Sequence, residues 1–142
     1  MRAVTRSPAQ AYALVIGLTL AAAGALGFFY EPSFSTGDGA EREAVLGVLD
    51  VNGWHNVVHL ASGLLGLAMA GSYAGARSYA LGFGVVYLLV AVTGFVYGDG
   101  GVIAGLVPVN TEDNVLHVLI GLAGLWAGGA TAPHPAPTTA PA

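Results

Sequence analysis

Four long apolar stretches without Lys, Arg or Glu restrict the fold of this chain more than any other feature. They cover residues 11–30, 51–71, 79–98 and 113–130. At about 1.5 Å per helical residue, stretches of this length reach roughly 27–32 Å, which matches a hydrocarbon core of about 30 Å. We therefore predict an all-α fold, an integral membrane four-helix bundle that forms one domain over residues 1–130.

The composition excludes several classes of function. The 142 residues include only 4 basic and 8 acidic side chains, whereas about a quarter of a soluble domain is charged. The chain has no cysteine and no lysine, which excludes thiolate metal sites, disulfides and Schiff-base chemistry. The arginines do not cluster, so nucleic-acid binding is not expected. Because no Gly-x-Ser-x-Gly or His-Glu-x-x-His signature is present, we expect no enzymatic activity.

The positions of the arginines predict the orientation in the membrane. Arg2 and Arg6 precede the first stretch and Arg77 lies in a predicted loop at 72–78, whereas the opposite side carries a single arginine, Arg42, among its acids. Basic residues near the ends of spans favour the cytoplasmic side. We expect a multi-pass protein of the plasma (inner) membrane with both termini cytoplasmic. Its expected partners are the lipid bilayer and, in an assembly, further copies of the chain or other membrane proteins.

The chain ends and the outer loop need separate interpretations. The first stretch runs on to Tyr30 and is too long for an ordinary signal peptide, so we interpret it as a retained membrane anchor. Four prolines in residues 131–142 prevent the last helix from continuing, and we predict a disordered cytoplasmic tail in which His134 has no role. Residues 41–49 could form a short interfacial helix in the acidic outer loop.

An internal repeat relates the second and fourth stretches. Residues 55–67 and 113–125 are identical at seven of 13 aligned positions. The identical polar positions are Asn56 with Asn114 and His59 with His117. Both stretches cross the membrane in the same direction, so we predict two parallel two-helix repeats related by a pseudo-twofold axis along the membrane normal.

The polar residues of these two stretches are the candidate site. An i, i+4 spacing places two potential ligands on one face of each helix. If the two faces converge, the predicted divalent-metal site (Zn²⁺ or Cu²⁺) consists of His55, His59, Asp113 and His117, with a polar layer of Asn56 and Asn114 nearby. His59 and His117 alone could instead bind a haem b iron as axial ligands.

The same residues can also be explained without a cofactor. Inside a bilayer, His and Asn side chains that face the bundle form interhelical hydrogen bonds worth about 0.6–2 kcal/mol. Asp113 lies in the first turn of its helix, where the helix dipole favours an acid without any metal. The leading hypothesis is thus a structural or accessory membrane protein with a His/Asn polar layer in the outer half of the bundle and no cofactor. A metal- or haem-binding module and a small transporter or proton conduit are the alternatives.

Several longer motifs together resemble a known family. The motifs are RSPAQ at 6–10, GWHNVVHL at 53–60, GARSY at 75–79, GVVYL at 84–88 and LVPVNTEDNVLH at 106–117. Over about residues 6–128 the chain resembles domain-of-unknown-function family 4383, a group of small bacterial four-span membrane proteins. The resemblance implies an uncharacterised inner-membrane protein and supplies no activity, substrate or cofactor. The candidate site residues all fall on the recurrent pattern of that family.

Overall fold

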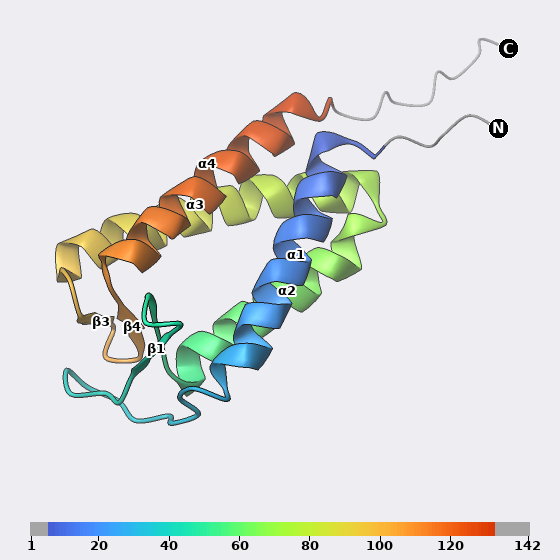
Figure 1. The fold of residues 1–142 in the computed structure, drawn as a ribbon. Coiled ribbons are helices and arrows are strands. Elements are labelled where there is room, and N and C mark those ends of the chain that lie inside the picture. The colour runs from blue at the N-terminus through green and yellow to red at the C-terminus, as the bar shows by residue number, and fades with distance from the viewer. Residues whose placement is uncertain (1–5, 133–142) are drawn as a thin grey trace, which may run out of the picture.

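The computed structural model describes residues 6–132, which form four helices and two short hairpins (Figure 1). The helices are α1 (Pro8–Gly27), α2 (Gly53–Ala70), α3 (Tyr73–Tyr97) and α4 (Thr111–Ala130). The strands are β1 (Glu43–Val45), β2 (Leu49–Val51), β3 (Gly101–Ile103) and β4 (Val107–Val109). The chain is mostly helical rather than all-α as predicted, because an antiparallel hairpin lies between α1 and α2 and another between α3 and α4.

Each helix begins after a polar N-cap residue whose side chain accepts a backbone N–H from the first turn. These residues are Ser7, Asn52, Ser72 and Asn110. Because a helix starts at the residue after its cap, the helices begin at other residues than the predicted apolar stretches. The predicted loop at 72–78 is therefore wrong: Ser72 caps α3, the helix starts at Tyr73, and Arg77 lies on it.

The predicted interfacial helix at 41–49 is also wrong, because this segment contains β1 and the start of β2. Val45 pairs with Leu49, and the turn between them has positive φ at Leu46 (54°) and Gly47 (72°). Glycine adopts that conformation without steric cost. The second hairpin has positive φ at the matching positions, Ala104 and Gly105.

The helices pack in two close pairs, α1 with α2 and α3 with α4 (Figure 1). Glycines allow this close approach. A Cβ added at Gly17 would lie 2.9 Å from the backbone nitrogen of Leu67, and one added at Gly84 would lie 2.8 Å from that of Leu125. Small residues at helix contacts are typical of helices that associate in lipid.

The helices carry many of their large apolar side chains on the outside of the protein. One such residue from each of α1, α2, α3 and α4 is Leu18 (54% exposed), Leu64 (54%), Leu89 (61%) and Leu119 (58%). The interior instead contains alanines, glycines and tyrosines, among them Ala13, Ala80 and Tyr79. Two of the helices, α1 and α3, are long and apolar enough to cross a membrane.

The ends of α1, α3 and α4 meet at Thr131, opposite the hairpins. The Thr131 hydroxyl accepts a hydrogen bond from the backbone N–H of Ala9 (2.9 Å), and its carbonyl accepts one from Arg77 Nε (2.8 Å). Thr131 is only 1% exposed, so the first residue of the predicted tail is packed. The rest of that tail, from residue 133 and including His134, lies outside the described residues.

Candidate metal centre

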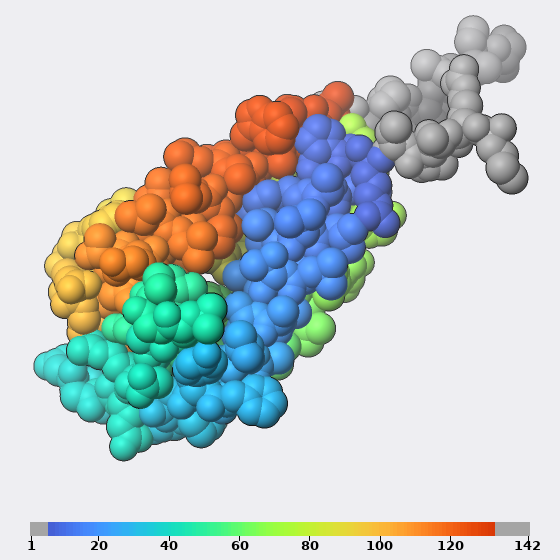
Figure 2. Space-filling model, viewed as in Figure 1, coloured from blue at the N-terminus to red at the C-terminus, as the bar shows by residue number. Residues whose placement is uncertain are grey.

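The two hairpins determine where the candidate site begins, because β2 leads into α2 and β4 leads into α4. Asn52 Oδ1 accepts the backbone N–H of His55 (3.0 Å), and Asn110 Oδ1 accepts that of Asp113 (2.8 Å). Both helices thus start from the same kind of cap. Figure 2 shows the first hairpin packed against the start of α4.

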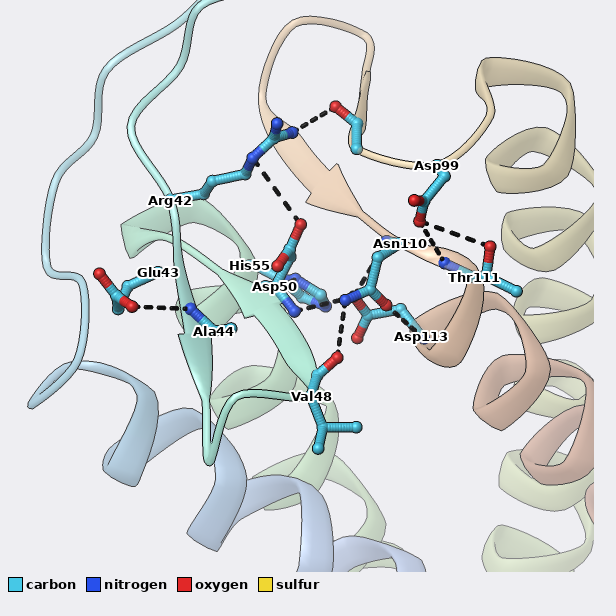
Figure 3. A network of polar contacts seen from close by, with 11 residues as sticks. Arg42, Glu43, Ala44, Val48, Asp50, His55, Asp99, Asn110, Thr111 and Asp113 are labelled. Atoms are coloured by element: carbon cyan, nitrogen blue, oxygen red, sulfur yellow. Dashed lines mark hydrogen bonds and ion pairs between the residues drawn. The ribbon is translucent and has the colours of Figure 1, made fainter.

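The same two asparagines also connect the hairpins to each other. Asn52 Nδ2 donates to the carbonyl of Leu106 in the second hairpin (2.8 Å), and Asn110 Nδ2 donates to the carbonyl of Val48 in the first (2.6 Å; Figure 3). Arg42 adds a further link, with its Nη1 donating to the Gly100 carbonyl. These contacts hold the first turns of α2 and α4 side by side.

Three histidines converge just inside these first turns. One ring nitrogen of each of His55, His59 and His117 lies within 4.8 Å of the others. The Nε2 atoms of His55 and His59 are 3.1 Å apart, and the ring centroids of His59 and His117 are 6.5 Å apart. His55 and His117 are 2% and 3% exposed, and His59 is half-buried. The structure therefore brings together three of the four predicted metal ligands.

A backbone contact determines which nitrogen of His55 is available. Its Nδ1 lies 2.9 Å from the carbonyl oxygen of Asp50. A carbonyl can only accept, so Nδ1 carries the proton and Nε2 of the neutral ring carries the lone pair. Metal-binding histidines commonly donate their second nitrogen to a backbone carbonyl or a carboxylate in this way. His55 is thus oriented to present Nε2 to His59.

The Nδ1 atom of His117 is the second indication of a site. It is buried and has no hydrogen-bond partner among the described residues. The ring of Tyr87 packs edge-on against the His117 ring, with centroids 5.3 Å apart. Most buried polar atoms in folded proteins are paired, so each exception needs an explanation.

Asp113, the fourth predicted ligand, lies in the same region but is used differently (Figure 3). Its Oδ2 accepts the backbone N–H groups of Asp50 (3.0 Å) and Asn110 (3.2 Å). The first bond ties α4 to the first hairpin, and the second closes the capping box of α4. This carboxylate is not in the histidine group, so the structure points to a site of three nitrogens.

The predicted polar layer of Asn56 and Asn114 faces the neighbouring helices instead of the histidines. The side chain of Asn56 packs against Gly27 of α1, and that of Asn114 against Gly94 of α3. Asn56 Nδ2 donates to the carbonyl of Glu31 (2.9 Å). The Oδ1 atoms of both asparagines are buried without a partner among residues 6–132. Asn56 thus contributes to the packing of α2 against α1, and Asn114 to the packing of α4 against α3.

The site does not fit a haem. The cavity beside the histidines has a volume of about 210 Å³, below the roughly 300–1,000 Å³ of ordinary cofactor and ligand pockets. The predicted axial ligand His59 has its Nε2 3.1 Å from His55 Nε2, so the His55 ring occupies the space in which a porphyrin bound to His59 Nε2 would lie. A small ion suits the three nitrogens better.

The sequence interpretation did not identify all of the residues that build the site. It missed the roles of Asn52 and Asn110, although Asn three residues before His55 or Asp113 is a recognisable cap signal. It also missed the contribution of the Asp50 carbonyl, a backbone group that no sequence pattern reveals.

Comparison with known proteins identifies the family. The family model described as Domain of unknown function (DUF4383) matches residues 10–130. The chain belongs to this family. No curated protein and no solved structure matches the chain. The DUF4383 match extends from α1 to the end of α4, so it includes both hairpins and all three histidines.

Proposed function

We propose that this DUF4383 protein is a four-span membrane protein that binds one divalent transition-metal ion through His55, His59 and His117. The observation that best supports this function is that these three histidines each place one ring nitrogen within 4.8 Å of the other two. The Nδ1 proton of His55 points toward the Asp50 carbonyl and so away from the other two histidines. A purely structural polar layer would not require this arrangement of three imidazoles.

The exposed apolar surface supports four spans. Besides α1 and α3, the helices α2 (18 residues) and α4 (20 residues) carry several large apolar side chains that are exposed. Such surfaces suit lipid rather than water, and helices of this length reach about 27–30 Å. The polar first two turns of α2 and α4, which contain the site, lower the mean hydropathy of both helices. We place both termini in the cytoplasm and the histidines in the outer half of the membrane.

Paired contacts support two parallel repeats. The Tyr12 hydroxyl of α1 donates to the carbonyl of Ile120 in α4 (3.0 Å), and the Tyr79 hydroxyl of α3 donates to the carbonyl of Ser62 in α2 (3.1 Å). The crossed hydrogen bonds of Asn52 and Asn110 have the same reciprocal form. We infer that the site lies on the pseudo-twofold axis between the repeats, where α2 and α4 approach each other.

The donor set indicates the kind of ion. Imidazole nitrogens suit Zn²⁺, Cu²⁺, Ni²⁺ and Co²⁺. Ligands at Zn–N distances of about 2.0–2.1 Å in a tetrahedron are about 3.4 Å apart, close to the 3.1 Å between His55 and His59 Nε2. Three protein ligands leave one coordination position open.

A cobalt titration of the purified full-length protein in detergent tests this function. We expect visible absorption bands that saturate at about one Co²⁺ per chain. His117→Gln should abolish the bands, and the control His134→Ala, which removes the histidine of the proline-rich C-terminal segment, should leave them unchanged. Absence of bands in the wild type, or their persistence in H117Q, would contradict the proposal.

A further inference from the structure

The cavity next to the three histidines is lined mostly by apolar side chains. This cavity of about 210 Å³ is lined on one side by His55, His59 and His117. Valine, isoleucine and phenylalanine side chains of α2, α3 and the second hairpin form most of the remainder. Among the described lining residues there is no carboxylate and no arginine. A ligand of the ion would therefore have to place every atom that does not touch the ion against mostly apolar side chains.

The cavity extends to the side of the helix bundle. Its two most exposed lining residues are Val58 of α2 (49%) and Val86 of α3 (48%). Both lie on surfaces that face lipid in the proposed membrane orientation. Between them the helices α2 and α3 are far less closely packed than the pairs α1 with α2 and α3 with α4. The second hairpin covers the cavity from the outer end through Ile103 and Val107.

We infer that the open coordination position of the ion binds a small uncharged molecule that reaches it from the lipid phase between α2 and α3. The inference rests on the proposed metal-binding function. The three imidazoles hold the ion, the apolar lining disfavours charge on the part of the molecule that does not touch the ion, and the cavity volume limits size. Tyr87 adds a hydroxyl to the lining, and that hydroxyl forms no hydrogen bond within residues 6–132.

Ligand titrations of the cobalt-loaded full-length protein test this inference, with pyridine as the uncharged probe and pyridine-3-sulfonate as the charged probe with the same ring nitrogen. We expect pyridine to shift the visible cobalt bands with a saturating dependence, and pyridine-3-sulfonate, whose anionic group would have to enter the apolar cavity, to bind at least about tenfold more weakly. Val86→Trp and Val90→Phe, which add volume at the lining, should weaken pyridine binding by about tenfold or more without changing the cobalt stoichiometry.

The neighbouring residue on α3 provides a matched control. Val85 is 49% exposed, like Val86, but does not line this cavity, so V85W should bind pyridine as the wild type does. Failure to bind cobalt overturns the proposed function and this inference together. Cobalt binding with no pyridine response, with pyridine-3-sulfonate binding as tightly as pyridine, or with unchanged pyridine binding in both V86W and V90F overturns this inference alone.

Discussion

The Nε2 atoms of His55 and His59 lie 3.1 Å apart on successive turns of α2. His55 directs its own proton to the Asp50 carbonyl, so without an ion the hydrogen bond between the rings must come from His59. In the proposed site, a metal ion would replace that hydrogen bond with two coordinate bonds and would also bind His117 of α4. The two alternatives therefore differ in what they connect. The metal ion would join α2 to α4, whereas the hydrogen bond between His55 and His59 lies within α2.

The Asp113 carboxylate should contribute to stability and not to metal binding. Asp113→Ala removes the acceptor of the Asp50 and Asn110 N–H groups, and we expect the free energy of unfolding to fall by about 1–3 kcal/mol. The cobalt stoichiometry should stay unchanged. Glu112→Ala, in the same turn but exposed, is the control and should change stability by less than about 0.5 kcal/mol. Loss of cobalt binding in D113A would restore Asp113 as a ligand.

The contacts of Asn56 and Asn114 with glycines should tolerate no added methyl group. At Gly27 and Gly94 a Cβ would overlap the facing asparagine amide, so alanine at either position should lower the free energy of unfolding by about 1–3 kcal/mol. Gly82→Ala is the control, since its Cβ would meet nothing within 4 Å. Thermal unfolding in detergent measures these differences. A G27A protein as stable as G82A would show that α1 and α2 are not packed as described.

The crossed asparagines should each contribute more than an ordinary helix cap. Asn52→Ala removes the cap of α2 and the hydrogen bond to the Leu106 carbonyl, so its cost should exceed the roughly 1 kcal/mol of a cap alone. Ser72→Ala is the matched comparison, because Ser72 caps α3 through a single hydrogen bond to the Gly75 N–H. Equal unfolding midpoints for N52A and S72A would mean that the link between the hairpins contributes nothing.

Part of this arrangement follows from the sequence. The i, i+4 spacing of His55 and His59 places both on one face of α2, and the sequence repeat gives His117 the position in α4 that His59 has in α2. Whether the two faces meet did not follow from the sequence. The family resemblance was also confirmed. The place of Asp113 in the first turn of α4 was predicted, but its bond to the backbone N–H of Asp50 in the distant first hairpin could not be.

The hairpins themselves were not predictable from periodicity. Strands of three residues are too short to show an alternating pattern, and the charges of residues 41–49 are equally compatible with a short interfacial helix. The positive φ of Gly47 and Gly105 is consistent with a turn, but glycine is so frequent in this chain that its position alone carried no signal.

The orientation of the chain has its own test. Arginines near the ends of α1 and α3 predict that a fluorescent reporter fused after Ala142 is active in the cytoplasm. Alkaline phosphatase inserted between Gly37 and Gly39, glycines around which a Cβ would meet nothing within 4 Å, should be active only outside. The opposite pattern in both fusions would place the histidines on the cytoplasmic side.

The metal content of the purified protein tests the central claim most directly. Elemental mass spectrometry of full-length protein, purified without chelator and without an affinity tag that binds metals, should find about one zinc, copper or nickel ion per chain. His59→Ala and His117→Gln should lose it, and His134→Ala should retain it. A wild-type protein that is metal-free and takes up no added ion, or a metal content that does not depend on His59 and His117, would contradict the account.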